Sequence, residues 1–178
     1  MSNVDDLIAL MGAVGAHHKH FYHFTDKRNL PTIREHGLLS LQELEKRGLK
    51  IPAPGGNDWS HDADRRKSLD DFVHLCLFDE HPMEYVAKNE GRISETVFLR
   101  VSPLVIKTPG TLASADVSNK SGVVTHPLEE ALSNVLDLEV VYTNTDWKDP
   151  EIQERRKAAK KYEILVPKHI DLALITGL

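Results

Sequence analysis

Three short segments of the sequence carry polar side chains that could bind a ligand or take part in catalysis. Tyr22-His-Phe-Thr25 places a histidine and a threonine two residues apart, so on a strand both face one side and could hydrogen-bond a single ligand. Asp64-Arg65-Arg66-Lys67 sets two arginines side by side, so on a helix at most one enters a site. Glu163 is the one polar member of the apolar segment Tyr162-Glu-Ile-Leu-Val. Taken singly, each segment also fits a structural role: a satisfied strand histidine, a solvated helix face and an edge-strand carboxylate.

The sequence predicts that helices and strands alternate along the chain around these three segments. Alternating side chains predict strands over 21–25, 72–78, 96–101, 162–167 and 172–175. Apolar spacing and capping residues predict helices over 5–17, 29–36, 41–47, 82–89, 127–135 and 149–161, and segment 62–69 is expected to be helical or turn-rich. Pro31 fits the first turn of its helix and Gly37 ends it, whereas 52–57 and 114–122 are expected to be loops, the second exposed. Segment 138–142 fits either a strand or a helix.

Length and composition favour one domain over residues 1–178, with an N-terminal helical segment (1–20) and a core (21–178). A chain of 178 residues, 40% of them hydrophobic, can bury one core but has little room for a second. No apolar run is long enough to cross a bilayer, and the acidic start does not resemble a signal peptide, so a cytoplasmic location is expected. The single cysteine, Cys76, excludes an internal disulfide and lies in an expected buried strand.

Net charge and histidine spacing bear on two functional classes, nucleic-acid binding and metal binding. A formal charge of −5 argues against a surface that coats duplex DNA by electrostatics alone, so a nucleic-acid site must be a local basic patch. The candidates are 65–67 and the run Arg155, Arg156, Lys157, Lys160 and Lys161. A binding module without catalysis would need these cations but not Glu163. A metal enzyme using His17, His18 and His20 is a weaker alternative, because their spacing fits no closed site and no cysteine assists.

The order of these segments resembles the DarT family of DNA ADP-ribosyltransferase toxins. Tyr22-His-Phe-Thr25, with Asn29-Leu30 and the helix ending at Gly37, is similar to the family's NAD⁺-binding opening. Asp64-Arg65-Arg66 is similar to its acidic-Arg-Arg motif, in which the second arginine is catalytic. The most specific part runs through Asp146-Trp-Lys-Asp-Pro150 and Glu154-Arg155-Arg156-Lys157 to Glu163-Ile-Leu-Val166, similar to the charged helix and catalytic-glutamate strand. The resemblance spans roughly 21 to 167, with gaps.

The resemblance implies a fold, an activity and a set of site residues. The fold is α+β, with central antiparallel or mixed β-sheets split around an NAD-binding cleft and flanked by helices. The activity is transfer of ADP-ribose from NAD⁺, the co-substrate, to a base of single-stranded DNA, with no metal. Glu163 and Arg66 would be catalytic; NAD⁺ would be bound by His23, Thr25, Asn29 and Arg66; and DNA would be contacted by Arg65, His74, Tyr85, Lys157, Lys160 and Lys161.

Chemistry gives Glu163 two expected tasks. Its carboxylate would bind a ribose hydroxyl and stabilise positive charge as the bond to nicotinamide breaks, and it could also accept the proton lost by the base nitrogen. Arg66 would keep a neighbouring glutamate ionised. Transfer to RNA or protein is the alternative enzymatic reading. The family also implies a DarG-like antitoxin partner with a macrodomain.

One departure concerns the target base. Thymidine-modifying members have a Tyr/Phe-rich strand leading into Ser-Pro-Met-Leu-Tyr, whereas this chain has Phe72-Val-His-Leu-Cys-Leu-Phe78 followed by Glu80-His-Pro-Met-Glu-Tyr85. The sequence therefore leaves guanine and thymine open as the base that is modified.

Overall fold

The computed structural model describes residues 4–13, 15 and 18–178. The α-helices are α1 (Val4–Ala13), α2 (Leu30–His36), α3 (Leu41–Lys46), α4 (Asp58–Arg66), α5 (Pro82–Asn89), α6 (Leu128–Asn134), α7 (Leu138–Tyr142) and α8 (Pro150–Ala159). The strands are β1 (Phe21–Asp26), β2 (Leu38–Leu39), β3 (Phe72–Cys76), β4 (Thr96–Val101), β5 (Leu112–Ser114), β6 (His126–Pro127), β7 (Glu163–Pro167), β8 (His169–Ile170) and β9 (Ile175–Thr176). Short 3₁₀ helices are η2 (Lys27–Asn29), η3 (Pro103–Lys107) and η4 (Leu172–Leu174).

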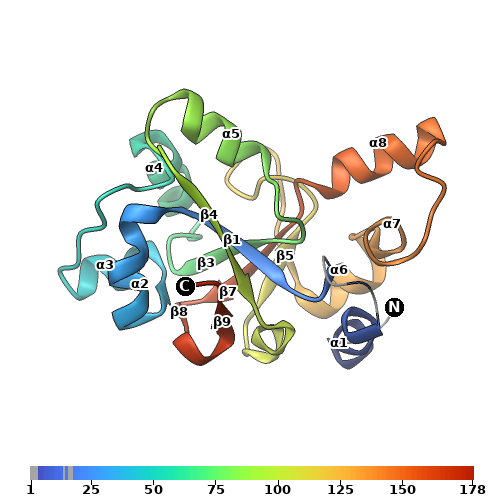
Figure 1. Ribbon diagram of the computed structural model, residues 1–178, viewed down its shortest axis with the longest axis horizontal. Helices are drawn as coiled ribbons and strands as arrows, with labels where there is room; N and C mark the ends of the chain where they lie inside the picture. Colours follow the sequence, from blue (N-terminus) through green and yellow to red (C-terminus); the bar gives the residue numbers. More distant parts are fainter. Residues whose placement is uncertain (1–3, 14, 16–17) are drawn as a thin grey trace.

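A seven-stranded antiparallel sheet organises the described chain, in the order β6-β5-β7-β3-β1-β4-β9. The short strands β2 and β8 pair separately. Helices α2, α3 and α4 lie at one end of the sheet, and α6, α7 and α8 lie at the other (Figure 1). The expected α+β class, with a sheet flanked by helices, is confirmed.

The sheet opens at its middle, between β1 and β3. β1 pairs with β4 along its whole length, from Phe21↔Val101 to Asp26↔Thr96, but with β3 only through Tyr22↔Cys76. Beyond that pair the two strands part, so their side chains border a space instead of packing against each other. The cavity described below lies at this separation.

The core lies on both sides of the sheet's central strands. Leu75, Leu99 and Ile164 are fully buried within these strands, and Leu7 and Met11 of α1 are buried where that helix packs on η3 and α6. Each such side chain contributes roughly 1.5–3 kcal/mol to folding. Cys76 is buried as expected, and its thiol donates to the Tyr22 carbonyl at 3.3 Å.

Gly37 fixes the turn between α2 and β2. Its φ of +74° favours glycine, and a Cβ built there would overlap the carbonyl oxygen of Ile170 in β8. The end of α2 therefore packs closely on the small β2–β8 sheet, at a position where the sequence places a glycine after the helix.

Several element boundaries differ from the sequence-based expectations. Segment 138–142 is helix α7, begun by the Asp137 side chain, which accepts from the Val140 amide at 3.5 Å. The strand expected over 172–175 is mostly η4, and pairing occurs only at β9. α1 ends at Ala13 rather than His17, and residues 14, 16 and 17 of that expected helix lie outside the described residues. No helix in the described ranges is long and apolar enough to span a bilayer.

Candidate active site

A cavity of about 230 Å³ lies where β1 and β3 separate. Its lining comes from both halves of the sheet, from the loop before α4, from α4 and α5, and from the loop after β5. These lining residues are His23, Phe24, Thr25, Asn29, Leu39, Ile51, Gly55, Gly56, Ser60, Asp64, His74, Met83, Val117, Asn119 and Glu163. A smaller neighbouring space of about 60 Å³ shares the β1 residues with it. Segments far apart in the sequence thus meet at one site.

His23 and Thr25 project from the same face of β1 into the cavity wall, as their spacing predicts. His23 Nδ1 donates to the His74 carbonyl at 2.9 Å, so Nε2 is the acceptor of the neutral ring. Burial, together with the charge of His74, lowers the His23 pKa and keeps this ring neutral. Thr25 Oγ1 accepts from the Asn29 amide at 3.0 Å.

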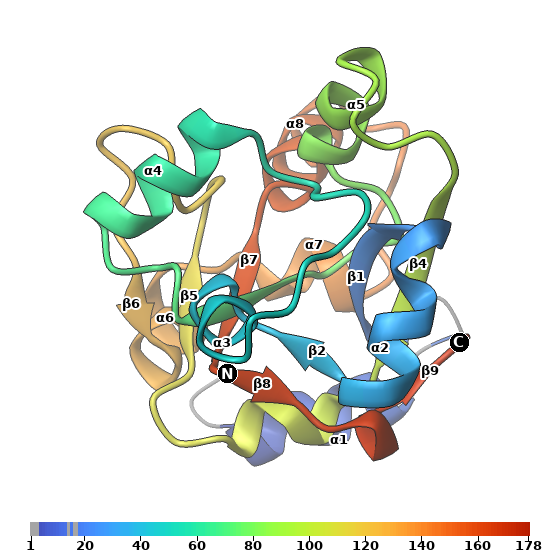
Figure 2. The ribbon, with the colours of Figure 1, turned by 90° about the vertical axis from the view of Figure 1, so that its left-hand side faces the viewer.

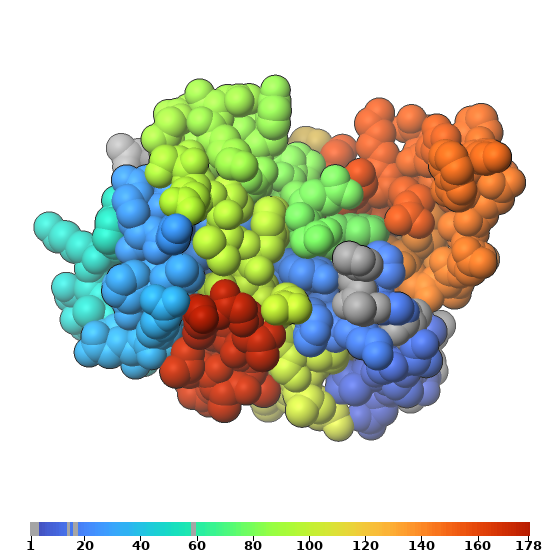
Figure 3. All heavy atoms as spheres, viewed as in Figure 1, coloured from blue at the N-terminus to red at the C-terminus, as the bar shows by residue number. Residues whose placement is uncertain are grey.

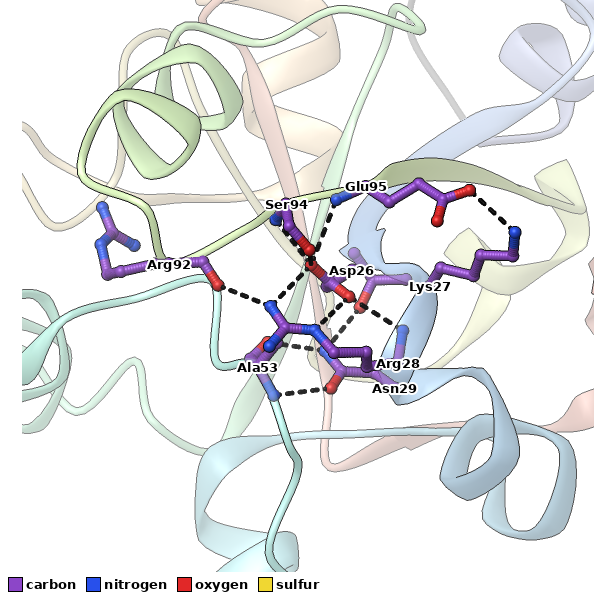
Figure 4. A network of polar contacts seen from close by, with 9 residues as sticks. Asp26, Lys27, Arg28, Asn29, Ala53, Arg92, Ser94 and Glu95 are labelled. Carbon is purple, nitrogen blue, oxygen red and sulfur yellow. Dashed lines mark hydrogen bonds and ion pairs between the residues drawn. The ribbon is translucent and has the colours of Figure 1, made fainter.

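Asn29 holds the wall of the cavity together. Its side-chain amide donates to the Ala53 carbonyl at 2.7 Å and accepts from the Ala53 amide at 3.0 Å (Figure 4). These two bonds fasten the loop before α4 to the start of α2. The Asn29 amide, which the sequence predicts to bind the cofactor, therefore has hydrogen-bond partners within the protein, and it fixes the position of the cavity wall.

Asp26 anchors the end of β1 directly below this wall. Its buried carboxylate accepts from Arg28 Nε at 2.8 Å and from the Ser94 amide at 2.7 Å (Figure 4). The hydrogen bond from Arg28 is the main reason that the pKa of Asp26 lies well below its usual range. The contacts join the β1–η2 junction to the turn before β4, so the wall that carries His23 is rigidly supported.

Glu163 lies on an inner strand of the sheet and is only 6% exposed, so the edge-strand interpretation is wrong. Its Oε2 atom accepts from the Ser118 amide at 3.0 Å, from the Ser118 hydroxyl at 2.5 Å and from His74 Nδ1 at 3.3 Å. His81 Nε2 lies 3.6 Å from Oε1, beyond hydrogen-bond distance. One oxygen is therefore anchored, whereas the other keeps its capacity to accept hydrogen bonds from a ligand.

In the part of the chain that the structure describes, the charged or titratable neighbours of this carboxylate are histidines and no arginine pairs with it. Burial alone would raise the pKa of Glu163, but the His74 hydrogen bond and charge, with His81 and Ser118, lower it. Burial alone would lower the pKa of His74, but Glu163, Asp64 and the Leu69 carbonyl raise it to about 9. Near neutral pH the structure thus holds an imidazolium–carboxylate pair, which takes the place expected for the charge of Arg66.

His81 approaches the open oxygen of Glu163 from the start of α5. Its Nδ1 accepts from the Met83 amide at 3.3 Å, so the proton of the neutral ring is on Nε2. The ring stacks on Phe24 with centroids 5.9 Å apart, and burial lowers its pKa. A neutral N–H group therefore lies near Glu163 Oε1 at 3.6 Å, and it has no hydrogen-bond partner among the described residues.

The loop over 115–125 brings Ser118 to Glu163, and Lys67 fastens that loop. Lys67 Nζ donates to the carbonyl oxygens of Ser118 at 2.7 Å, Lys120 at 2.5 Å and Val123 at 2.9 Å. Figure 2 shows α4 beside this loop. The expectation of an exposed loop from Ser114 is therefore wrong at Ser114 and Ser118, which are fully buried.

Asp64 is a second carboxylate in the cavity, and sequence reasoning gave it no role. It lies on α4 one turn after Ser60, which also lines the cavity. Its Oδ1 atom is buried and has no hydrogen-bond partner in the described part of the chain. The spacing of Ser60 and Asp64 on one helix face is the signal that could have indicated it.

Arg65 and Arg66 follow Asp64 but lie outside the cavity lining formed by the described residues. Arg66 is exposed, and its Nε donates to the Asp62 carbonyl at 3.2 Å. Arg65 pairs with Glu45 and, at 3.4 Å, with Asp62. Arg66 thus does not line the cavity that contains Glu163, and its expected catalytic role stays a prediction.

The residues expected to contact DNA occupy two different environments. His74 lies beside Glu163 and lines the cavity, with its side chain 29% exposed, so its expected contact with DNA stays a prediction. Tyr85 is 67% exposed on α5, and a groove beside it is lined by Glu80 and Lys160, which pair at 2.8 Å. The surface is notched between α5 and α8 (Figure 3). Lys157 is exposed and pairs with Glu154, and Lys161 is half-buried.

The metal alternative gains no support from the described residues, in which no group of three potential ligands is assembled. His17, one of the three histidines it needs, lies outside the described residues.

Solved structures of similar fold identify the class of protein to which this chain belongs. Thermosipho africanus DarTG in complex with ADP-ribose matches with a TM-score of 0.67 and 22% identity, over 88% of this chain and 42% of that chain. Thermus sp. 2.9 DarT in complex with ADP-ribosylated ssDNA matches with a TM-score of 0.61 and 20% identity, over 87% and 78% of the two chains. The same Thermus protein in complex with NAD⁺ gives 0.54 and 23%, over 92% and 81%. The fold is that of an ADP-ribosyltransferase.

The family model described as "ssDNA thymidine ADP-ribosyltransferase, DarT" matches residues 22–178. The chain therefore belongs to the DarT family. It spans less than half the length of the Thermosipho chain. No curated protein matches it.

Proposed function

We propose that this protein transfers ADP-ribose from NAD⁺ to a base of single-stranded DNA and releases nicotinamide. The proposal rests on the environment of Glu163, a buried carboxylate in the cavity. Its Oε2 atom is held by hydrogen bonds from the protein, and its Oε1 atom can accept one from a ligand. Family membership supports the reaction, and the Thermus relative has been seen with NAD⁺ and with ADP-ribosylated ssDNA.

Glu163 supports the chemistry through its charge. As the bond between nicotinamide and ribose breaks, the ribose gains positive charge, and a buried carboxylate stabilises that charge more than water does. The lowered pKa of Glu163 keeps it ionised for this task. The open Oε1 can also accept a hydrogen bond from a ribose hydroxyl.

His23 and Thr25 are proposed to bind the nicotinamide ribose or its amide from the opposite wall, with Asn29 keeping that wall in place. The cavity of about 230 Å³ is smaller than the ~300–1,000 Å³ of typical ligand pockets. It therefore suits the reacting end of NAD⁺, and the rest of the dinucleotide extends beyond it. The exposed guanidinium of Arg66 is proposed to bind a phosphate outside the cavity.

Single-stranded DNA is the favoured substrate because base nitrogens in a duplex are paired and stacked. Extruding a base from a duplex costs a few kcal/mol, which a single strand avoids. Tyr85 offers an exposed ring on which a base can stack, and Lys157, Lys160, Lys161 and Arg65 are proposed to guide phosphates. Thymine is favoured by the description of the matching family model, and guanine is the second candidate because of the departure over 72–85.

A modification of this kind would block DNA replication, so we propose that the protein acts in the cytoplasm as a toxin with a DarG-like macrodomain antitoxin. The similar Thermosipho structure is of DarTG with ADP-ribose. Expression of the chain alone, with and without such a partner, tests this pairing through arrest of DNA replication.

The first test is the reaction itself. Purified protein with NAD⁺ and four single-stranded oligonucleotides, each enriched in one base, is expected to shift one of them by one ADP-ribose. Glu163→Gln keeps the shape and an acceptor oxygen but removes the charge, so we expect a loss of at least about 10²-fold in rate. The matched control is Glu95→Gln, which changes an exposed glutamate paired with Lys27.

Equal rates for Glu163→Gln and wild type would remove Glu163 from the mechanism. Transfer to RNA or to a protein, with none to DNA, would favour the alternative substrates. DNA binding without consumption of NAD⁺ would indicate a binding module.

A further inference from the structure

We propose that Asp64, and not Glu163, accepts the proton that the attacking base nitrogen loses, so that the cavity contains two carboxylates with separate tasks. This inference rests on the function proposed above and assigns the proton transfer within it. Glu163 then remains charged throughout and stabilises the ribose.

The position of Asp64 is the first support. It lies on α4 and lines the same cavity as Glu163 of β7 and His74 of β3. Its Oδ1 atom is buried and has no hydrogen-bond partner among the residues that the structure describes. A buried acceptor without a donor is costly in a folded protein, so its retention inside a cavity indicates that a ligand supplies the donor.

The surroundings of Glu163 make it a poor proton acceptor. Its Oε2 atom already accepts three hydrogen bonds from Ser118 and His74, and His81 Nε2 lies 3.6 Å from Oε1. Each of these donors, and the imidazolium charge of His74, stabilises the ionised carboxylate. These contacts suit a residue that must keep its charge.

The pKa values of the two acids are shifted in opposite directions. Burial raises the pKa of Asp64, and the negative charge of Glu163 on β7 raises it further. Three groups lower it: the charge of His74 on β3, a side-chain hydrogen bond with Asn119 in the loop after β5, and the charge of His61 on α4 itself. The pKa of Glu163 is lowered. Environments that separate the pKa values of two acids in one site mark different roles, and the acid with the higher pKa is the better base.

The reaction balances with this assignment. The base nitrogen forms a bond to the ribose C1 atom while the bond from C1 to the nicotinamide nitrogen breaks. Its electron pair stays with the nicotinamide, which leaves neutral. The proton of the base nitrogen moves to Asp64, which becomes a neutral carboxylic acid and later releases the proton to solvent.

The test compares Asp64→Asn with Asp62→Asn, a matched change at a 65% exposed aspartate on the same helix. Asp64→Asn is expected to lower kcat by about 10²-fold or more, the usual contribution of a general base, with KM for NAD⁺ within about threefold of wild type. Asp62→Asn is expected to resemble wild type. A base must be deprotonated to act, so the wild-type rate should fall as the pH drops through the raised pKa of Asp64, and this acidic limb should disappear in Asp64→Asn.

The outcomes separate this role from the proposed function. Wild type that transfers ADP-ribose, with Asp64→Asn matching it in kcat and in the acidic limb, would overturn the role of Asp64 alone. A raised KM with unchanged kcat would make Asp64 a binding residue and would also overturn it. No transfer by wild type to any oligonucleotide would overturn the proposed function as well. If Asp64→Asn fails to fold, Asp64→Glu, which keeps a carboxylate, must retain transfer with a displaced acidic limb, and an unchanged limb would refute the proposal.

Discussion

At the scale of single residues, the site depends on the difference between the two oxygens of Glu163, because His74 and Ser118 form hydrogen bonds with only one of them. Both donors bind Oε2 and leave Oε1 for the ligand. The ion pair is partly buried, with Glu163 8% and His74 29% exposed, so removing His74 leaves the buried charge of Glu163 poorly compensated and is expected to destabilise the fold. We expect changes at His74 to affect both stability and the rate of transfer.

The His74–Glu163 pair predicts a specific dependence of stability on pH. The pKa of His74 is raised from 6.5 to about 9, so its contribution is fully present below 6.5 and is lost as the pH rises through about 9. Urea unfolding of wild type should therefore show a falling free energy of unfolding over this range, and His74→Gln should flatten the fall. The control, His169→Gln, changes a histidine that is 49% exposed. The same slope in wild type and His74→Gln would contradict the ion pair.

The sequence predicted part of the site at this scale. His23 and Thr25 were found because strand alternation puts them on one face, and Glu163 because a carboxylate in an apolar strand is unusual. Ser118 and His81 were missed because their importance comes from contacts with Glu163 across 45 residues and 82 residues of chain. No local period encodes such contacts.

At the scale of elements, α4 and the loop over 115–125 act as one unit. Lys67, directly after α4, uses its ammonium group to bind three carbonyl oxygens of that loop, and the loop in turn supplies Ser118 to Glu163. A residue in the predicted basic cluster thus positions the loop instead of contacting phosphate.

Lys67→Met tests this link, because methionine keeps much of the side-chain length but donates no hydrogen bond. We expect transfer to slow by up to about 10²-fold, because three hydrogen bonds of roughly 1 kcal/mol each hold the loop. In a double-mutant cycle with Ser118→Ala the two effects should be non-additive, because both act through Glu163. Lys46→Met, at an exposed lysine of α3, is the control. Additive losses in single-turnover rates would separate Lys67 from Ser118.

Regular elements with strong local signals were predicted well, and irregular ones were not. The bounds expected for the helix over 82–89 and the strand over 96–101 agree with α5 and β4. The alternation over 172–175 did not produce a long strand, because only Ile175 and Thr176 find partners on β4. Pairing depends on the edge that the fold leaves open, which the segment itself does not specify.

At the scale of the whole molecule, the charges limit how DNA can be bound. The formal net charge is −5, and several cations of the predicted patches are already engaged. Arg155 binds Asp137 at 2.6 Å and Glu139 at 2.7 Å, and Lys160 pairs with Glu80. Phosphate binding must therefore depend on a small number of side chains.

This limit predicts a shallow dependence of DNA affinity on salt. Each phosphate neutralised on a single strand contributes a slope of about −0.7 in log K against log salt concentration. We expect a small total slope for wild type, and a reduction by up to about 1.4 in Lys157→Ser/Lys161→Ser, measured by fluorescence anisotropy with a labelled oligonucleotide. The control is Lys46→Ser. An unchanged slope in the double variant would place the phosphates elsewhere.

The position of β7 between β5 and β3 has a consequence for when the site can form. β3 and β5 both precede β7 in the sequence, and each pairs with β7 but not with the other. Until β7 is present, the part of the sheet that contains β5 and β6 has no strand through which to join β3. The strand that brings Glu163 into the cavity is therefore the same strand that joins the two parts of the sheet, so the site can form only once they are joined.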